Sequence, residues 1–199
     1  TQGYSSAASD VYKRQIYIAR MENPWTLGSE RVLISKPELE WERHHKNENG
    51  WNPSYDIFVN EGPQPLLSPK GKYVHIAYSA SGVWTPYYAL GMLTASTDSD
   101  MLDPKSWSKS QQPVFKQSPE NGVYGTGHNS FFPSPDGTEW YILYHARDTQ
   151  VDPEGAGDTR SPRAQKFVWL ENDYPDFGTP LPTTARLNKP SGIVTTSAK

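Results

Sequence analysis

A short pattern of turn and strand occurs twice in this chain, and it restricts the fold more than any other feature. Residues 68–78 read SPKGKYVHIAY and residues 134–144 read SPDGTEWYILY, so the same turn and apolar alternation recur at an offset of 66 residues. A second pair starts at Trp25 and Trp107, at an offset of 82 residues. Repeated units of short strands and tight turns are typical of β-propeller blades or a related β-array. Chance recurrence of a common turn is the alternative, but it does not account for the shared alternation.

The composition favours an all-β domain. Aromatic residues make up 13% of the chain, and 18 Pro and 15 Gly interrupt it too often for long helices. Alternation of period two predicts strands at residues 73–78, 140–144 and 166–169, and the run 16–19 also begins as a strand. No window shows a sustained helical period. A chain of 199 residues can bury a substantial core, so we expect a single domain.

Glu61 follows a strand-like run over residues 55–59, and we expect the Gly62-Pro63 dipeptide after it to stop the strand. The end of a strand on a rigid scaffold is a common place for a catalytic group. In the second repeated unit, His128 takes nearly the same place. Two titratable groups at equivalent strand ends predict an active site at the hub of the repeating fold.

Charge and cysteine content exclude several classes of function. The formal net charge is −3, and the chain has no basic run of the kind that binds nucleic acid. No stretch is long and apolar enough for a membrane span, so we expect neither nucleic acid nor membrane as a partner. The absence of cysteine excludes disulfides, thiolate metal sites and cysteine nucleophiles.

Four motifs in chain order resemble glycoside hydrolase family 43, especially its α-L-arabinofuranosidase members. They are VNEGPQ (59–64), SASGVW (79–84), GTGHNSFF (125–132) and RSPRAQKF (160–167). The resemblance implies an all-β fold, a five-bladed β-propeller of which this chain contains roughly the C-terminal three blades. It also implies inverting hydrolysis that releases α-L-arabinofuranosyl residues from arabinan or arabinoxylan. A β-xylosidase of the same family and a non-catalytic carbohydrate-binding propeller are the alternatives.

By resemblance, Glu61 is the general acid that protonates the leaving oxygen. An inverting glycosidase also needs a carboxylate base, about 6.5–9.5 Å from the acid. The family supplies this base, and a second aspartate that tunes the acid, upstream of the glutamate. The chain has only Asp10 and Asp56 ahead of Glu61, and on one strand Asp56 would point to the opposite face. We therefore expect the chain to lack both aspartates and to be inactive as written. Glu42, beside Trp41, is the rival acid.

By resemblance, His128 lies at the floor of the propeller funnel, where it orients catalytic groups or contacts a central hydrated cation. No cofactor is required, but a structural Ca²⁺ or other cation at the propeller centre is a candidate, bound to His128 through water. The alternative is a buried His128 that forms hydrogen bonds within the core. The other histidines have no such context, and we expect His75 and His145 to be surface or packing residues.

Arg163 and Trp84 complete the expected substrate-binding set. The planar fork of Arg163 suits sugar hydroxyls, and the alternative is a structural ion pair with Asp158 or Glu154. Trp84 offers an apolar face to a sugar ring, although packing within a blade is its alternative role. Weaker candidates for the same aromatic role are Trp41, Trp51 and Tyr87.

The first residues differ from the rest of the chain. Residues 9–15 read SDVYKRQ, which resembles a translated sequencing-adapter tail, with an ordinary disordered N-terminus as the alternative. We expect residues 1–15 to be non-native or disordered and residues 16–199 to form a partial β-propeller catalytic domain. The expected partner is an oligo- or polysaccharide substrate. The full-length parent is expected to be a monomer that is secreted or periplasmic.

Overall fold

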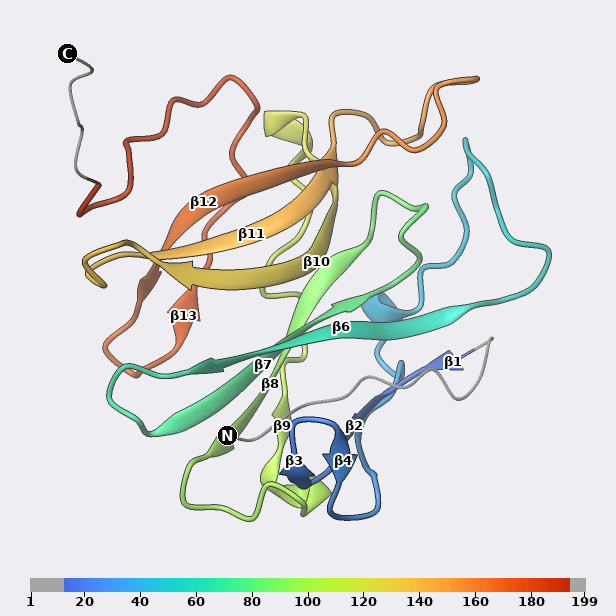
Figure 1. Cartoon of the computed structure of the whole chain (residues 1–199). Helices are drawn as coiled ribbons and strands as arrows, with labels where there is room; N and C mark the ends of the chain where they lie inside the picture. Colours follow the sequence, from blue (N-terminus) through green and yellow to red (C-terminus); the bar gives the residue numbers. More distant parts are fainter. Residues whose placement is uncertain (1–12, 194–199) are drawn as a thin grey trace.

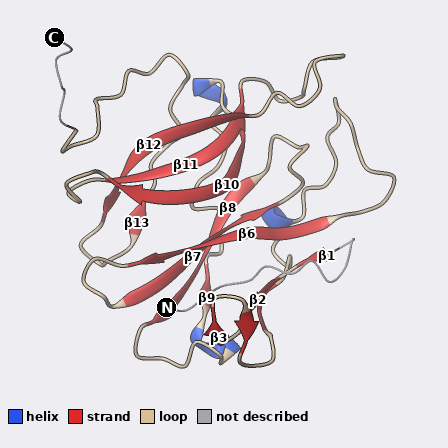
Figure 2. Ribbon diagram, viewed as in Figure 1, coloured by secondary structure: helices blue, strands red, loops and turns tan. Residues whose placement is uncertain are grey.

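The computed structural model describes residues 13–193, and two antiparallel sheets form most of this part of the chain (Figures 1 and 2). Residues 1–12, with Asp10 among them, lie outside the described residues. The strands of the first sheet follow the order β1-β6-β7-β8-β9, and those of the second follow the order β10-β11-β12-β13. Within the first sheet, β1 runs parallel to β6, whereas the other neighbours are antiparallel.

The strands of the first sheet are β1 (Lys13–Arg14), β6 (Phe58–Leu67), β7 (Tyr73–Ala80), β8 (Ala89–Ser96) and β9 (Ser108–Lys109). Those of the second are β10 (Tyr124–Pro133), β11 (Trp140–Arg147), β12 (Ser161–Trp169) and β13 (Pro175–Asp176). In each sheet, three long antiparallel strands follow one another along the chain, as in a propeller blade, and a short turn joins the first two (residues 68–72 and 134–139). The strands predicted at residues 73–78, 140–144 and 166–169 are therefore confirmed.

A third unit, which lies beside the first sheet, consists of two small two-stranded sheets (Figure 1). They pair β2 (Ile16–Ile18) with β5 (Val32–Ser35), and β3 (Met21–Asn23) with β4 (Thr26–Leu27). The remaining elements are short 3₁₀ helices: η1 (Glu40–Glu42), η2 (Pro104–Ser106) and η3 (Pro119–Asn121). No helix within residues 13–193 has the length and apolarity needed to cross a membrane.

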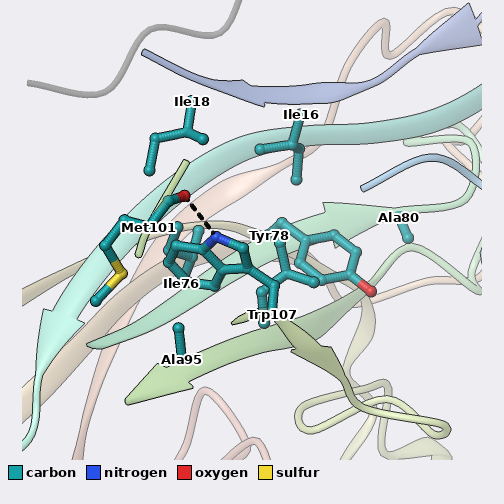
Figure 3. Close-up of a cluster of buried hydrophobic side chains, with 9 residues drawn as sticks. Ile16, Ile18, Ile76, Tyr78, Ala80, Ala95, Met101 and Trp107 are labelled. Atoms are coloured by element: carbon teal, nitrogen blue, oxygen red, sulfur yellow. Dashed lines mark hydrogen bonds between the residues drawn. The ribbon is translucent and has the colours of Figure 1, made fainter. Parts of the chain in front are cut away.

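Apolar side chains pack on both faces of the first sheet, so its middle strands are almost continuously buried. On one face, Ile76 and Tyr78 of β7 pack with Ile16, Ile18 and Trp107 (Figure 3). The opposite core joins the two large sheets and contains Leu66, Leu90, Phe115, Val123, Ile142, Tyr144, Ala146, Phe167 and Phe177. The first sheet is therefore a middle layer between the small sheets and the second sheet.

The first long strand of each large sheet contains a β-bulge at equivalent positions. In β6 the register shifts between Glu61 and Gln64, and Gly62 has a φ of +58°. In β10 it shifts between Gly127 and Ser130, and His128 has a φ of +50°. Since Gly62 and His128 are 66 residues apart, the bulge is part of the repeat. A bulge redirects side chains and often lies next to an active site.

Two sequence predictions need correction. The Gly-Pro dipeptide after Glu61 does not stop the strand, because β6 runs on to Leu67 and accommodates Pro63 within the bulge, where the ladder is locally disrupted. The weaker repeat does not mark equivalent positions either. Trp25 is 82% exposed, whereas Trp107 is buried and donates its indole N–H to the carbonyl oxygen of Met101.

Candidate active site

Glu61 lies at the start of the β6 bulge with a carboxylate that is 15% exposed. The hydroxyl of Tyr88 donates a hydrogen bond to Glu61 Oε1 over 2.8 Å. Arg14, whose side chain is about half exposed, forms an ion pair with Oε2. Each carboxylate oxygen therefore has a different partner, one buried and one accessible.

Tyr88 is a fully buried residue just ahead of β8. Burial raises the pKa of its hydroxyl well above the ordinary value, and the negative charge of Glu61 adds to this effect. Tyr88 consequently keeps its proton and acts as the donor towards Glu61. A Cβ atom on Gly127 would lie only 2.3 Å from Cε1 of Tyr88, so the missing side chain at Gly127 makes room for this ring.

His145 packs against the ring of Tyr88. Its ring stacks on Tyr88 with 5.4 Å between centroids and 4° between planes. Burial, followed by the positive charge of Arg160, lowers the pKa of His145 to about 4. Both ring nitrogens are buried and lack a hydrogen-bond partner among the described residues. His145 is therefore a neutral ring that supports Tyr88.

His128 occupies the β10 bulge, where its side chain is exposed in this chain and its ring lies near Gly62. Its backbone N–H donates to Ser79 Oγ over 2.7 Å, and Ser79 is the strand partner of Glu61. The ring also stacks with His145, with 6.4 Å between centroids. The alternative of a buried, hydrogen-bonded core histidine is wrong, and the structure does bring His128 to the side of Glu61.

Glu42 has a completely different environment from Glu61. Its side chain is 0% exposed, and Oε1 accepts hydrogen bonds from Tyr78 at 2.9 Å and from Asn60 at 3.1 Å. Oε2 accepts from Lys109 Nζ at 2.8 Å and from the backbone N–H groups of Glu38 and Leu39. A carboxylate that accepts from five donors and is closed to solvent cannot deliver a proton to a sugar, so Glu42 is not the acid.

Arg163 pairs with a residue that the sequence did not indicate. Its Nη2 atom donates to Asp148 Oδ1 over 2.9 Å, whereas Asp158, the partner considered above, binds Arg160 instead. The Arg163 side chain is 8% exposed, and its Nε and Nη1 atoms lack a hydrogen-bond partner among the described residues. Both atoms are also closed to solvent, and the structure shows no contact between Arg163 and Glu61.

Trp84 lies in the turn that leads to Tyr88, with its indole N–H donating to the carbonyl oxygen of His45 over 2.9 Å. Trp51 packs edge-to-face on it, with 5.7 Å between ring centroids. Asp56 lies ahead of β6 and pairs with His45 over 2.8 Å, so it takes no place beside Glu61. His75, as expected, is a packing residue that binds Thr94 and the carbonyl oxygen of Asp173.

A cation at His128 is not supported by the surrounding residues. Within residues 13–193 no group of three or more His, Asp and Glu side chains lies close enough to hold a metal ion. Ca²⁺ needs six to eight oxygen ligands, and Glu61 is the only carboxylate found in the His128 surroundings described above. The expected cation, bound to His128 through water, stays a prediction.

Tyr88 and His145 are the residues that the sequence analysis missed. The hydrogen bond between Tyr88 and Glu61 joins residues that are 27 positions apart in sequence, and no local sequence pattern predicts it. The position of His145 follows from the repeat, because His145 lies 66 residues after Ser79. Ser79 is the strand partner of Glu61, and His145 is the strand partner of Gly127. The repeat could therefore have placed His145 at the hub, although the sequence analysis expected only a surface or packing residue there.

Comparison with known proteins decides the family. The profile of glycosyl hydrolases family 43 matches residues 3–175. The chain belongs to this family. Among curated relatives of this family 43 chain, the extracellular exo-α-(1→5)-L-arabinofuranosidase of Streptomyces avermitilis is 41% identical over 169 residues, which are 83% of this chain and 32% of that protein. Alpha-L-arabinofuranosidase 43 of Humicola insolens is 38% identical over 84% of this chain and 32% of its own length.

Solved structures of an α-L-arabinofuranosidase and of a family-43 glycoside hydrolase are also similar to this chain. The α-L-arabinofuranosidase of Lactobacillus brevis superposes with a TM-score of 0.76 at 36% identity, over 90% of this chain and 52% of that one. A thermostable family-43 glycoside hydrolase gives a TM-score of 0.69 at 26% identity, over 95% of this chain and 54% of its own. The two curated relatives named above are longer proteins, and this chain spans about a third of their length. The predicted fold class, part of a five-bladed β-propeller, is confirmed.

Proposed function

We propose that this chain is the acid-bearing part of an inverting α-L-arabinofuranosidase that acts on arabinan or arabinoxylan. The observation that carries the proposal is Glu61, a partly exposed carboxylate at a β-bulge, held by the Tyr88 hydroxyl at 2.8 Å. The names of the relatives at 36–41% identity support arabinofuranose as the sugar. Likeness to a xylan β-1,4-xylosidase from Bacillus halodurans, at 17% identity, concerns the fold alone.

The two oxygens of Glu61 have separate roles in this proposal. Oε1 accepts from Tyr88, which keeps its own proton, so the transferable proton belongs on Oε2. Oε2 is the oxygen that Arg14 contacts, and a substrate oxygen would replace Arg14 there. His128 and Arg163 are the proposed binding residues for the sugar hydroxyls. The base is an aspartate that this chain does not carry, so we propose that the chain alone has no turnover. No cofactor is needed for the proton transfer.

Relatives named extracellular arabinofuranosidases support a secreted or periplasmic parent protein. The proposed partner is an arabinose-containing oligo- or polysaccharide.

The test uses a chimera in which this chain replaces the matching 169-residue segment of the Streptomyces avermitilis relative. Glu61→Gln should lower the hydrolysis of α-(1→5)-L-arabinotriose by about 10²–10⁴-fold, the usual contribution of a general acid. Hydrolysis of 4-nitrophenyl α-L-arabinofuranoside should fall much less, because nitrophenolate leaves without protonation. Equal losses on both substrates would contradict the acid role. Turnover by this chain alone would contradict the proposal that it lacks the base.

A further inference from the structure

The tripeptide Glu-Asn-Gly occurs twice in this chain, at residues 48–50 and 120–122. Asparagine followed by glycine is especially prone to spontaneous deamidation, because glycine has no side chain to hinder attack by its own backbone nitrogen. The residue before each asparagine is also the same. Any large difference in reactivity between the two sites in the folded chain must therefore come from the structure around them.

The folded chain protects Asn121. This residue ends the 3₁₀ helix η3, and its side-chain Nδ2 donates to the carbonyl oxygen of Pro180 over 2.8 Å. The backbone N–H of Gly122, whose nitrogen would have to attack, donates instead to the carbonyl oxygen of Pro119 over 3.1 Å. Gly122 also has a left-handed conformation, with a φ of +64°. Both reacting groups are thus held by hydrogen bonds, and deamidation at Asn121 requires local unfolding.

Asn49 lacks this protection. It is exposed, and its side-chain amide has no hydrogen-bond partner among residues 13–193. The backbone N–H of Gly50 donates to the carbonyl oxygen of Asn47 over 3.4 Å, which is longer than the usual N–H···O distance of about 2.7–3.2 Å. The segment lies in the loop between η1 and β6, outside any helix or strand. The nitrogen of Gly50 therefore has only a weak bond to give up before it can approach Asn49 Cγ.

We infer that Asn49 is a site of spontaneous deamidation in the folded chain, and that Asn121 is not. The backbone nitrogen of Gly50 forms a bond to Asn49 Cγ, and the Cγ–Nδ2 bond breaks. The proton of the Gly50 N–H goes to the leaving group, which departs as ammonia and leaves a cyclic succinimide. Water then opens the ring at either carbonyl group, which gives aspartate or isoaspartate at this position. The reaction needs only water and does not depend on the proposed glycosidase activity.

The two products should affect the surrounding loop differently. Aspartate keeps the path of the main chain, and the Asn49 side chain has no contact that the change would break. Isoaspartate adds a methylene group to the main chain. The loop is closed by hydrogen bonds of 2.6 Å and 2.7 Å between the side chain of Asn52 and the backbone of Asn47, which a longer main chain would misalign. Trp51 lies inside this loop and packs edge-to-face on Trp84, with 5.7 Å between ring centroids. Isoaspartate should therefore release Trp51 from Trp84.

The test is incubation of the chain in a mildly alkaline buffer made with heavy-oxygen water, followed by peptide mass spectrometry of both sites. Hydrolysis of the succinimide introduces a labelled oxygen, which distinguishes new deamidation from any that preceded the incubation. In the folded chain, Asn49 should react at least about tenfold faster than Asn121, because Asn121 must first unfold locally. In concentrated urea, where neither site keeps its hydrogen bonds, the two rates should agree within about twofold.

Two variants serve as controls. Asn49→Gln should abolish the reaction at this site, because glutamine forms the larger cyclic imide far more slowly, and should leave the rate at Asn121 unchanged. Asn49→Asp carries the new charge without the longer main chain. Its near-UV circular dichroism should therefore match that of the fresh chain, whereas the isoaspartate fraction isolated after incubation should show a weaker tryptophan signal.

Three results would overturn the assignment of Asn49: equal rates at the two sites without urea, a rate ratio that persists unchanged in urea, or no labelled product at Asn49. Identical circular dichroism of the isoaspartate fraction and the Asn49→Asp variant would overturn the release of Trp51. The chimera tests the acid role of Glu61 separately, so either proposal can fail while the other stands.

Discussion

Glu42 and Glu61 are 19 residues apart in sequence, and each accepts a hydrogen bond from a buried tyrosine, yet their surroundings differ in every other respect. Glu42 is closed to solvent and also binds Lys109. Glu61 lies at a bulge, with one oxygen bound to Tyr88 and the other accessible. The comparison teaches that burial with every lone pair satisfied makes a carboxylate structural, whereas one oxygen at a strand irregularity, paired only with the half-exposed Arg14, leaves it able to react.

The largest effect is expected at Glu42. Glu42→Gln should lower the free energy of unfolding by about 3–5 kcal/mol, because it leaves the 12%-exposed Lys109 ammonium with only the more distant Glu38 carboxylate, at 3.9 Å. The new amide would also direct N–H groups at some of the existing donors. Urea unfolding of the chain measures the change. The control, Glu61→Gln, should change it by less than about 1 kcal/mol. Similar losses in both variants would remove the distinction between the two glutamates.

The two tyrosines give a matched pair. Tyr78→Phe should cost about 1.5–3 kcal/mol, the usual value of a hydrogen bond to a buried charge, since Glu42 has no access to water. Tyr88→Phe should cost about 0.5–1.5 kcal/mol, because water can reach the Glu61 carboxylate. The same unfolding measurement applies, and a larger loss at Tyr88 would contradict the comparison.

The largest pH dependence of the free energy of unfolding should come from His145, which stacks on Tyr88 next to Glu61. The pKa of His145 is about 4 in the folded chain, because of burial and the charge of Arg160, whereas an unfolded histidine titrates near 6.5. As the pH falls from 7 to 5, the unfolded chain takes up a proton that folded His145 does not, so the free energy of unfolding should fall by about 1–2 kcal/mol. Burial also lowers the pKa of His75, which acts in the same direction.

The variant His145→Gln separates these two histidines. It should remove the larger part of the loss between pH 7 and pH 5, and His75→Gln should remove a further part. Unfolding curves at the two pH values, for the chain and both variants, give the answer. An unchanged pH dependence in the His145 variant would show that this ring is not the neutral support of Tyr88.

The smallest effect is expected at Arg14. Its ion pair with Glu61 involves a side chain that is 52% exposed, and exposed ion pairs contribute about 0–1 kcal/mol. If residues 1–15 are non-native, as expected from the sequence, Arg14→Ala should lower the free energy of unfolding by less than about 0.5 kcal/mol. A loss above 1 kcal/mol would indicate that Arg14 belongs to the native domain.

Much of the fold could be predicted because its signals are local. The alternation in residues 73–78 and 140–144 depends on the faces of single strands, and the 66-residue repeat located both Glu61 and His128 at the hub. The continuation of β6 through Gly62-Pro63 could not be predicted, because a bulge and a strand end look alike in sequence.

The site itself was only partly predictable, because its contacts join distant segments. The Glu61–Tyr88 bond spans 27 residues, and the Arg163–Asp148 bond spans 15. The role of Glu42 also depends on partners far along the chain, such as Lys109, 67 residues away. Composition and spacing identify candidate carboxylates, but only tertiary packing shows which of them keeps an oxygen accessible to solvent.

The most direct test of this division between the two glutamates is turnover per folded molecule in the chimera with the Streptomyces avermitilis relative. Arabinotriose hydrolysis would be measured for Glu42→Gln and Glu61→Gln, with the folded fraction of each determined by near-UV circular dichroism. We expect the Glu42 variant to be less stable but to keep its rate per folded molecule within about threefold, since it removes no reacting group. The Glu61 variant should stay folded and lose at least about a hundredfold. A hundredfold loss in the folded Glu42 variant, with the Glu61 variant still active, would contradict the account.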